Sequence, residues 1–226
     1  MCGRYSITTP LEAMRQLFHF DGSPNLAPRY NVAPTQSVPV VRRKNGGREL
    51  VLLRWGLIPS WAKDARIGAS LINARGETVQ SKPAFRSAFA KRRCLVLADS
   101  FYEWQKRGSA KQPWRIMLAD GAPFGFAGLW ESWHSTDGDI LQTCSIITTE
   151  ANDLTRPIHE RMPVILDAAD HARWLDPTTL LPELALLLKP YPAAGMQAYP
   201  ITTRINAVKN DDADCLTPLA DGKLLL

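Results

Sequence analysis

Short runs of β-branched and aromatic residues, separated by turns that contain glycine or proline, recur along most of the chain. The segments Val38–Val41 and Leu50–Leu53 flank Asn45-Gly46-Gly47 and predict a β-hairpin with a glycine-rich turn. Strands this short and closely spaced indicate a curved, largely antiparallel sheet. Similar runs predict strands over Cys94–Trp104, Pro113–Leu118, Phe124–Trp130, Thr143–Thr148, Met162–Leu166 and Ala198–Thr202.

The segments with helical spacing are fewer and shorter. We expect helices over Pro10–Phe18, Pro83–Ala90, Glu150–Thr155, Ala168–Leu175 and Leu180–Leu188. Thr149 is suited to cap the third of them, which should end at Arg156 because Pro157 follows. No repeat, low-complexity tract or change of composition divides the 226 residues. The sequence therefore predicts one α+β domain over residues 1–226, built on a curved, mostly antiparallel β-sheet or open barrel with short peripheral helices.

Composition limits where such a protein works and what it binds. The chain is 45% hydrophobic and 22% charged, as globular proteins are, and no apolar stretch is long enough to span a membrane. The N-terminus lacks an apolar secretion signal, so we expect a cytoplasmic protein, associated with the nucleoid in a bacterium. We also expect a monomer. The net charge of +5 is compatible with a nucleic-acid partner. We expect no metal or cofactor and no disulfides, because the four cysteines are far apart: Cys2, Cys94, Cys144 and Cys215.

Cys2 is the first candidate for chemistry. Removal of Met1 would expose an α-amine with a pKa of about 7.7–8.0, on the carbon atom next to the one that carries a thiol with a pKa of about 8.5. Such a pair condenses with an aldehyde in two steps, first to an imine and then to a five-membered thiazolidine ring. Taken alone, Cys2 is better explained as an incidental small residue in a first strand.

The segment Leu71–Thr78 predicts a strand with one polar face. A period of two places Asn73, Arg75 and Glu77 on that face. An amide beside a guanidinium suits a phosphate or sugar ligand. A solvated sheet face with a surface ion pair explains the same pattern.

Glu103 lies between two aromatic residues near the end of an internal strand. Desolvation in such surroundings raises the pKa of a carboxyl group toward neutrality, which proton transfer requires. A buried glutamate paired with an arginine is the structural alternative.

His159 has the best context for acid–base work among the four histidines. It precedes Arg161 in a stretch that Pro157 and Pro163 stiffen, and in an extended chain the two side chains point the same way. The other histidines, His19, His134 and His171, fall near a helix end, in a polar loop and on a surface helix.

Six segments in this order resemble the SRAP (SOS-response-associated peptidase) family, over nearly the whole chain. They are Met1–Arg4, Arg29–Thr35, Trp55–Trp61, Asn73–Thr78, Phe101–Trp104 and His159–Pro163. Each is weakly specific alone, and the six together are highly specific. One departure is visible: Ser100 stands where the family's motif has glycine, which could alter a local bend beside Glu103.

The resemblance implies covalent capture of abasic sites in single-stranded DNA by the N-terminal cysteine. Cys2, Asn73, Glu103 and His159 would be catalytic: His159 as acid at the sugar ring oxygen, Glu103 as proton shuttle, and Asn73 as the group that orients the amine or a sugar hydroxyl. Removal of Met1 would be autocatalytic or the work of an aminopeptidase. The residues expected to contact DNA are Arg4, Asn31, Pro34, Trp61, Arg75, Arg86, Thr148 and Arg161.

Two other functions fit part of the pattern. Cys2 and His159 could form the thiolate–imidazole pair of a cysteine hydrolase, or Cys2 could serve an N-terminal-nucleophile amidohydrolase. A non-enzymatic single-strand binder would leave the four-residue pattern unexplained.

Overall fold

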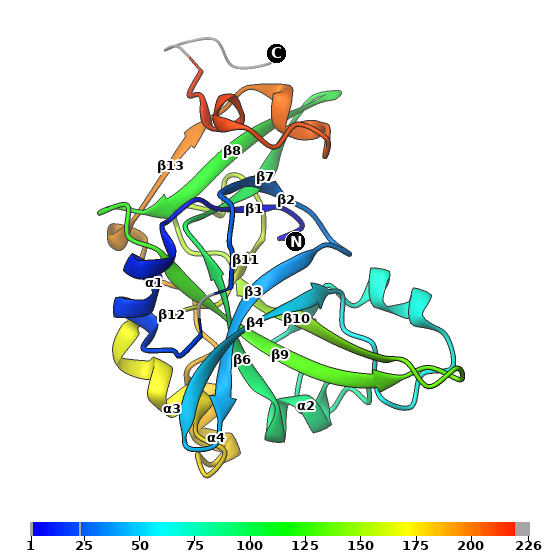
Figure 1. Cartoon of the computed structure of the whole chain (residues 1–226). Coiled ribbons are helices and arrows are strands. Elements are labelled where there is room, and N and C mark those ends of the chain that lie inside the picture. Colours follow the sequence, from blue (N-terminus) through cyan, green and yellow to red (C-terminus); the bar gives the residue numbers. More distant parts are fainter. Residues whose placement is uncertain (1, 23, 220–226) are drawn as a thin grey trace.

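A ring of five strands forms the centre of the computed structural model, which describes residues 2–22 and 24–219 (Figure 1). The strands are hydrogen-bonded in the order β10-β4-β3-β6-β9, and β9 pairs with β10 again, so the ring closes into a barrel. Only the β10–β4 contact within the ring is parallel. The predicted α+β fold with a curved, mostly antiparallel sheet is therefore confirmed. The ring strands are β3 (Ser37–Lys44), β4 (Gly47–Trp55), β6 (Arg93–Ala98), β9 (Phe124–His134) and β10 (Ile140–Glu150).

Short strands extend the barrel, and a second sheet lies against it. β5 (Asn73–Arg75) runs parallel to β10, while β11 (Arg161–Pro163) and β12 (Ile165–Leu166) run antiparallel to β10 and β9. The second sheet has the order β13-β8-β7-β1-β2, so β1 lies between two neighbours. Its strands are β1 (Tyr5–Ile7), β2 (Arg29–Val32), β7 (Ser100–Arg107), β8 (Ala110–Leu118) and β13 (Met196–Pro200).

The helices are short and lie at the periphery of the two sheets (Figure 1). None of those in the described ranges is long and apolar enough to cross a membrane. The α-helices are α1 (Leu11–Phe18), α2 (Arg86–Lys91), α3 (His171–Leu175) and α4 (Leu181–Leu186). The 3₁₀ helices are η1 (Ala65–Ser70), η2 (Ala168–Asp170), η3 (Ala193–Gly195), η4 (Thr203–Asn206) and η5 (Ala213–Leu216).

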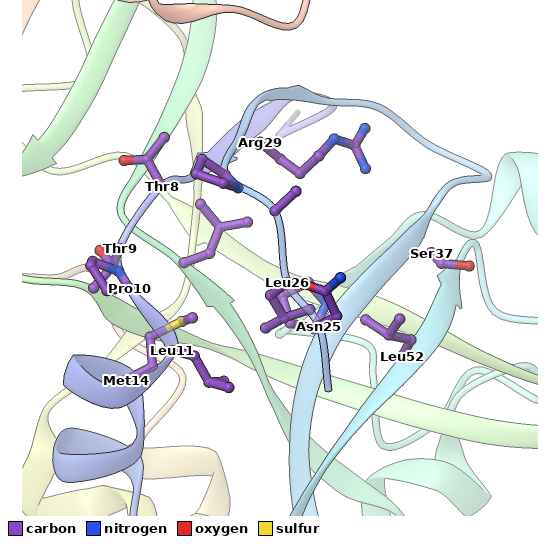
Figure 2. A pocket seen from close by; sticks show the side chains of 14 residues that line it. Thr8, Thr9, Pro10, Leu11, Met14, Asn25, Leu26, Arg29, Ser37 and Leu52 are labelled. Atoms are coloured by element: carbon purple, nitrogen blue, oxygen red, sulfur yellow. The ribbon is translucent and has the colours of Figure 1, made fainter. Parts of the chain in front are cut away.

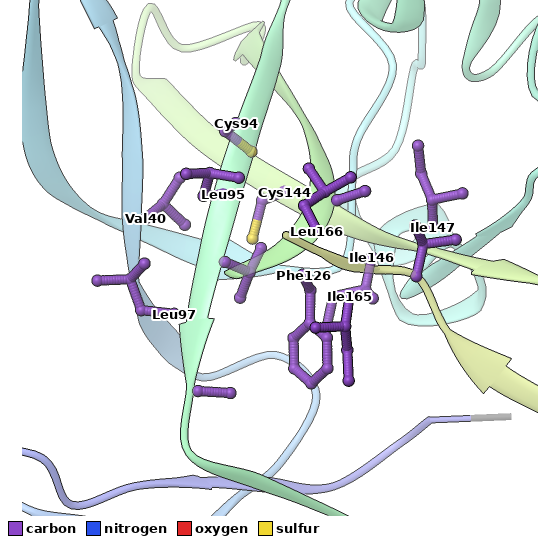
Figure 3. Packing of buried hydrophobic residues seen from close by; sticks show 14 of the residues in the cluster. Val40, Cys94, Leu95, Leu97, Phe126, Cys144, Ile146, Ile147, Ile165 and Leu166 are labelled. Atoms are coloured by element: carbon purple, nitrogen blue, oxygen red, sulfur yellow. The ribbon is translucent and has the colours of Figure 1, made fainter. Parts of the chain in front are cut away.

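Aliphatic and aromatic side chains of the barrel strands fill the core (Figure 3). All of β6 is buried, which is why its sequence is apolar on both faces. Each fully buried valine, leucine, isoleucine or phenylalanine contributes about 1.5–3 kcal/mol relative to exposure. Residues from all five barrel strands meet there, among them Val40, Leu50, Leu95, Phe126 and Ile146.

The predicted strand Cys94–Trp104 is wrong as a single element. The chain leaves the barrel at the end of β6 and enters the second sheet as β7, with Asp99 between them. The Asp99 carboxylate accepts hydrogen bonds from the Ser6 hydroxyl and from the backbone N–H groups of Thr8 and Thr9 (3.1 Å for Thr9). These bonds fasten the end of β1 at the point where the chain changes sheets.

Ser100, which stands where the family has glycine, does not bend the chain at Glu103. β7 pairs with β8 in regular register from Phe101 to Arg107. The Ser100 hydroxyl is buried, accepts a hydrogen bond from Arg115 Nε (2.9 Å) and lies 2.5 Å from the Ser6 hydroxyl. The Ser100 hydroxyl thus forms part of a polar cluster with the side chains of Ser6 and Arg115.

The predicted helix Glu150–Thr155 is also wrong. Glu150 ends β10, and the residues after it form consecutive turns. The Asn152 side-chain oxygen accepts hydrogen bonds from the Thr155 N–H (2.9 Å) and hydroxyl (3.0 Å), as at a helix N-cap, so the turns start after Asn152 and not at Glu150. Among the other expected elements, Met162–Leu166 divides into β11 and β12, and Leu71–Thr78 keeps only β5 as a strand.

We expect Gly56→Ala to lower the free energy of unfolding by about 3 kcal/mol. Gly56 has a φ of +127°, and a Cβ atom there would lie 2.6 Å from the carbonyl oxygen of Gly68. Gly46 is the matched control, since its φ is +85° but a Cβ atom added there would have no other atom within 4 Å. Gly46→Ala should cost about 1 kcal/mol, and urea unfolding of both variants measures the difference. Equal losses would contradict the close contact between the two glycine backbones.

Candidate active site

The second sheet brings Cys2 alongside Glu103. Tyr5 of β1 pairs with Phe101 of β7, and the Tyr102 N–H donates to the Arg4 carbonyl (3.0 Å), so the residues before β1 continue along β7. Cys2 is completely buried. Burial raises the pKa of its thiol above the ordinary range, and the charge of Glu103 raises it further. The thiol is therefore protonated at neutral pH and needs a base before it can attack.

Asn73 holds the main chain of Cys2. β5 runs beside β10, and from its first position the Asn73 amide nitrogen donates to the carbonyls of Cys2 and Ile72, both at 3.0 Å. The Asn73 amide oxygen is buried, and no described residue donates a hydrogen bond to it. Within the described ranges it is thus an acceptor without a donor, next to the residue whose amine the sequence predicts to react.

Glu103 and His159 line one hollow of about 450 Å³, together with Trp104, Lys111 and Asn206. The Glu103 side chain is almost entirely buried. Burial raises the pKa of its carboxyl group, and the neighbouring His159 opposes part of that rise. A raised pKa makes a carboxyl group a stronger base once it is ionised, which suits a group that takes and returns a proton.

The backbone of Arg161 serves the His159 ring in either neutral tautomer. The Arg161 N–H lies 3.0 Å from His159 Nδ1, and the Arg161 carbonyl oxygen lies 3.2 Å from the same atom. Nδ1 can accept from the first group or donate to the second, so Nε2 can either carry a proton or take one. The turns after β10 set this position, since the His159 N–H donates to the Thr155 carbonyl (2.9 Å).

Four segments far apart in the sequence therefore meet at the edge where the second sheet adjoins β5. The hydrogen bond from Asn73 to Cys2, the charge of Glu103 next to the thiol, and the hollow shared by Glu103 and His159 connect them. A second, more apolar hollow lies between α1, residues 25–29 and Leu52 (Figure 2). It contains none of the four residues.

The model of the family described as SOS response associated peptidase (SRAP) matches residues 1–208. The chain belongs to the SRAP family. It is 45% identical over 222 residues to the abasic site processing protein YoaM of Bacillus subtilis, covering 96% of this chain and 97% of that protein. It is 33% identical over 227 residues to the abasic site processing protein HMCES of Gallus gallus, covering 86% and 67%. A crystal structure of a protein from Bacteroides thetaiotaomicron is similar with a TM-score of 0.90 and 29% identity, covering 97% and 100%.

Two residues of this SRAP chain that the sequence predicts at the DNA surface, Asn31 and Thr148, are completely buried. The Asn31 amide nitrogen faces the carbonyls of Ile205 (3.2 Å), Ala207 (3.1 Å) and Asn210 (2.7 Å). Asn31 therefore fastens the C-terminal segment to β2. No local pattern reveals this, because the Ile205 partner lies 174 residues away in the sequence.

Arg4 and Arg161 are engaged within the protein. Arg4 Nη1 donates to the Asn31 amide oxygen (2.7 Å) and the Ile205 carbonyl (2.9 Å). The Arg161 guanidinium pairs with both carboxylate oxygens of Glu77, at 2.5 and 3.0 Å, and donates to the Thr148 carbonyl at 2.7 Å. Glu77, expected on a strand face with Asn73, thus lies in the turn after β5 and holds the residue that supports His159.

The remaining predicted DNA contacts face solvent at least in part. Trp61 is 60% exposed, and Arg75 and Arg86 are exposed. Pro34 is partly buried in a turn next to Thr35, which has a φ of +71°. Trp133 supports the loop of Trp61 through a hydrogen bond from its indole N–H to the Ala62 carbonyl (2.7 Å). Their contact with DNA stays a prediction.

Sequence reasoning missed two residues of the hollow, Lys111 and Asn206. Lys111 lies between the predicted strands Cys94–Trp104 and Pro113–Leu118, whereas β7 and β8 extend through most of that interval. Asn206 comes from η4 in the C-terminal segment, and its side-chain oxygen accepts a hydrogen bond from the Trp104 indole (2.7 Å). Only the packing of that segment on β7 brings it to the site.

Proposed function

We propose that this SRAP protein captures abasic sites in single-stranded DNA covalently through Cys2, and so shields the lesion during replication. Relatives along nearly the whole chain are named abasic site processing proteins. The open form of an abasic sugar is an aldehyde, the electrophile that an amine and a thiol on adjacent carbon atoms capture. Met1 lies outside the described residues, and its removal, by the protein itself or by an aminopeptidase, is part of the proposal.

The first step joins the Cys2 amine to the sugar. His159 donates a proton to the ring oxygen as the bond from that oxygen to C1 breaks, and the C1 hydroxyl loses its proton to water, which leaves the open aldehyde. The amine attacks the aldehyde carbon, a carbinolamine forms, and loss of water leaves an imine. The Asn73 amide oxygen, which lacks a donor among the described residues, accepts from the amine and orients it. Each proton transfer of this kind contributes about 10²–10⁴-fold in rate.

The second step closes the thiazolidine. Glu103 takes the proton of the Cys2 thiol, and the sulfur attacks the imine carbon. The electron pair of the C=N bond moves to nitrogen, which receives the proton back from Glu103. Overall, aldehyde and aminothiol give thiazolidine and water. The raised pKa of the thiol explains why a base must stand beside it, and the raised pKa of Glu103 suits a group that takes and returns one proton.

The same pKa shift disfavours a cysteine hydrolase. A thiolate–imidazole pair needs a thiol whose pKa is lowered by the neighbouring cation. Here burial and the charge of Glu103 both raise the pKa of Cys2. We therefore assign His159 to the sugar and Glu103 to the thiol. We further propose that the protein is cytoplasmic and acts as a monomer without metal or cofactor.

The observation that carries the proposal is the hydrogen bond from Asn73 to the Cys2 carbonyl, beside the hollow that Glu103 and His159 share. The test mixes purified protein with a single-stranded oligonucleotide that holds one abasic site. We expect a heat-stable adduct whose mass equals protein without Met1 plus DNA minus one water. An acetylated Cys2 amine should give none. A Met1-free protein that forms no adduct would refute the proposal.

A further inference from the structure

Two lysines face each other where β7 turns into β8. Lys106 and Lys111 are directly opposite in the antiparallel pair, so they share one face of the hairpin, while Arg107, the next residue, lies on the other face. Both lysines are exposed, and neither forms a salt bridge with any described residue. Arg107 instead donates from Nε to the Gln105 amide oxygen (2.9 Å) on that other face. We call Lys106 and Lys111 the basic hairpin end.

The hairpin itself does not need this arrangement. Like charges directly opposite in a sheet are destabilising, and cross-strand pairs contribute about 0.2–1 kcal/mol. Gly108, with a φ of +56°, supplies the conformation that the turn requires. Repulsion between the two lysines therefore slightly destabilises the free protein, and a bound anion would remove this repulsion.

The basic hairpin end is continuous with the site. Lys111 lines the hollow of Glu103 and His159, where the other walls, Trp104 and Asn206, carry no charge. A DNA strand whose abasic sugar is held at Cys2 has a phosphate on each side of that sugar. Lys106 is the cross-strand neighbour of Lys111, so a strand that leaves the hollow past Lys111 would meet Lys106 next.

We propose that the basic hairpin end binds the backbone phosphates of single-stranded DNA on one side of the captured nucleotide. This inference rests on the proposed function. It assigns the strand a path over the end of β7 and β8, away from the exposed Trp61, Arg75 and Arg86 on the barrel side. In Figure 1 the end of this hairpin lies above the start of the chain, and the segment that follows β4 lies below it and to the right.

The first test measures binding without the covalent step. The double variant Lys106→Ala/Lys111→Ala and the matched control Lys91→Ala/Lys189→Ala are compared by fluorescence anisotropy on an intact oligonucleotide at several salt concentrations. Lys91 and Lys189 are also exposed and line none of the hollow. Loss of two phosphate contacts should flatten the slope of log affinity against log salt by about 1.4, while the control keeps it. Lys106→Arg/Lys111→Arg should retain the slope.

The second test locates the contact along the strand. Adduct formation is timed on abasic oligonucleotides shortened either on the 5′ side or on the 3′ side of the lesion. The double variant should be slower than the wild type on one shortened strand and equal to it on the other. An unchanged salt slope, or an equal deficit on both strands, overturns the inference. A wild type that binds with the expected slope but forms no adduct refutes the proposed function instead.

Discussion

Cys2→Ser should eliminate the heat-stable adduct and leave non-covalent binding to single-stranded DNA intact. The serine amine can still form an imine, but the hydroxyl is too weak a nucleophile at neutral pH to close the ring. The imine hydrolyses on heating, unless borohydride reduces it first. Denaturing gels with and without borohydride therefore separate the two steps that we propose for Cys2.

Cys215→Ser is the matched control for this variant. Cys215 is also completely buried, in the C-terminal segment, where its thiol faces the Asn210 carbonyl at 3.4 Å. A hydroxyl group replaces the thiol there without loss of the contact, so the control should form the adduct as the wild type does. A heat-stable adduct with Cys2→Ser would mean that the amine alone holds the DNA.

Glu103→Gln should slow adduct formation by about 10²–10⁴-fold at neutral pH, because the amide cannot take the thiol proton. The rate should also lose the part of its pH dependence that comes from ionisation of Glu103. Single-turnover kinetics between about pH 5 and pH 9 measure both effects. Glu150→Gln, which changes an exposed carboxyl group at the end of β10, is the control and should leave the rate unchanged.

The same variant should change stability in a direction fixed by the raised pKa of Glu103. The folded protein holds the carboxyl proton to higher pH than the unfolded chain, so ionisation of Glu103 lowers the free energy of unfolding as pH rises. Glu103→Gln removes that loss. Its stability relative to the wild type should increase from the ordinary carboxyl range up to the raised pKa, and then stay constant. A relative stability that falls over this range would contradict the buried position of Glu103.

Much of this fold can be predicted from local sequence patterns, because the alternation of a strand and the residues of a turn depend on only a few neighbouring positions. The hairpin of β3 and β4 follows from Asn45 and Gly46, whose positive φ values match the turn that their sequence favours. The change of sheet at Asp99 could not be predicted in the same way. The residues on both sides form strands with the same apolar pattern, and the groups that bind the Asp99 carboxylate lie 90 residues or more earlier.

The site shows the same limit. The six motifs bring out Cys2, Asn73, Glu103 and His159, and the structure gathers the four at one edge. Some polar residues of the motifs are buried and others are exposed, and the motifs themselves do not show which. Asn31 and Thr148 lie inside, with partners that only the tertiary fold supplies, while Trp61 and Arg75 are exposed.

The interior position of β1 has a mechanical consequence for a protein attached to DNA at Cys2. Only Gly3 and Arg4 separate the attachment point from β1, and β1 is hydrogen-bonded on one side to β7 and on the other to β2. A force along β1 loads its hydrogen bonds to β7 and to β2 at the same time and does not open them one by one. The rate of forced unfolding depends on that barrier and not on the equilibrium stability. If Cys2 captures DNA as proposed, a force that pulls on the trapped strand would therefore have to shear the second sheet before it could unfold the protein.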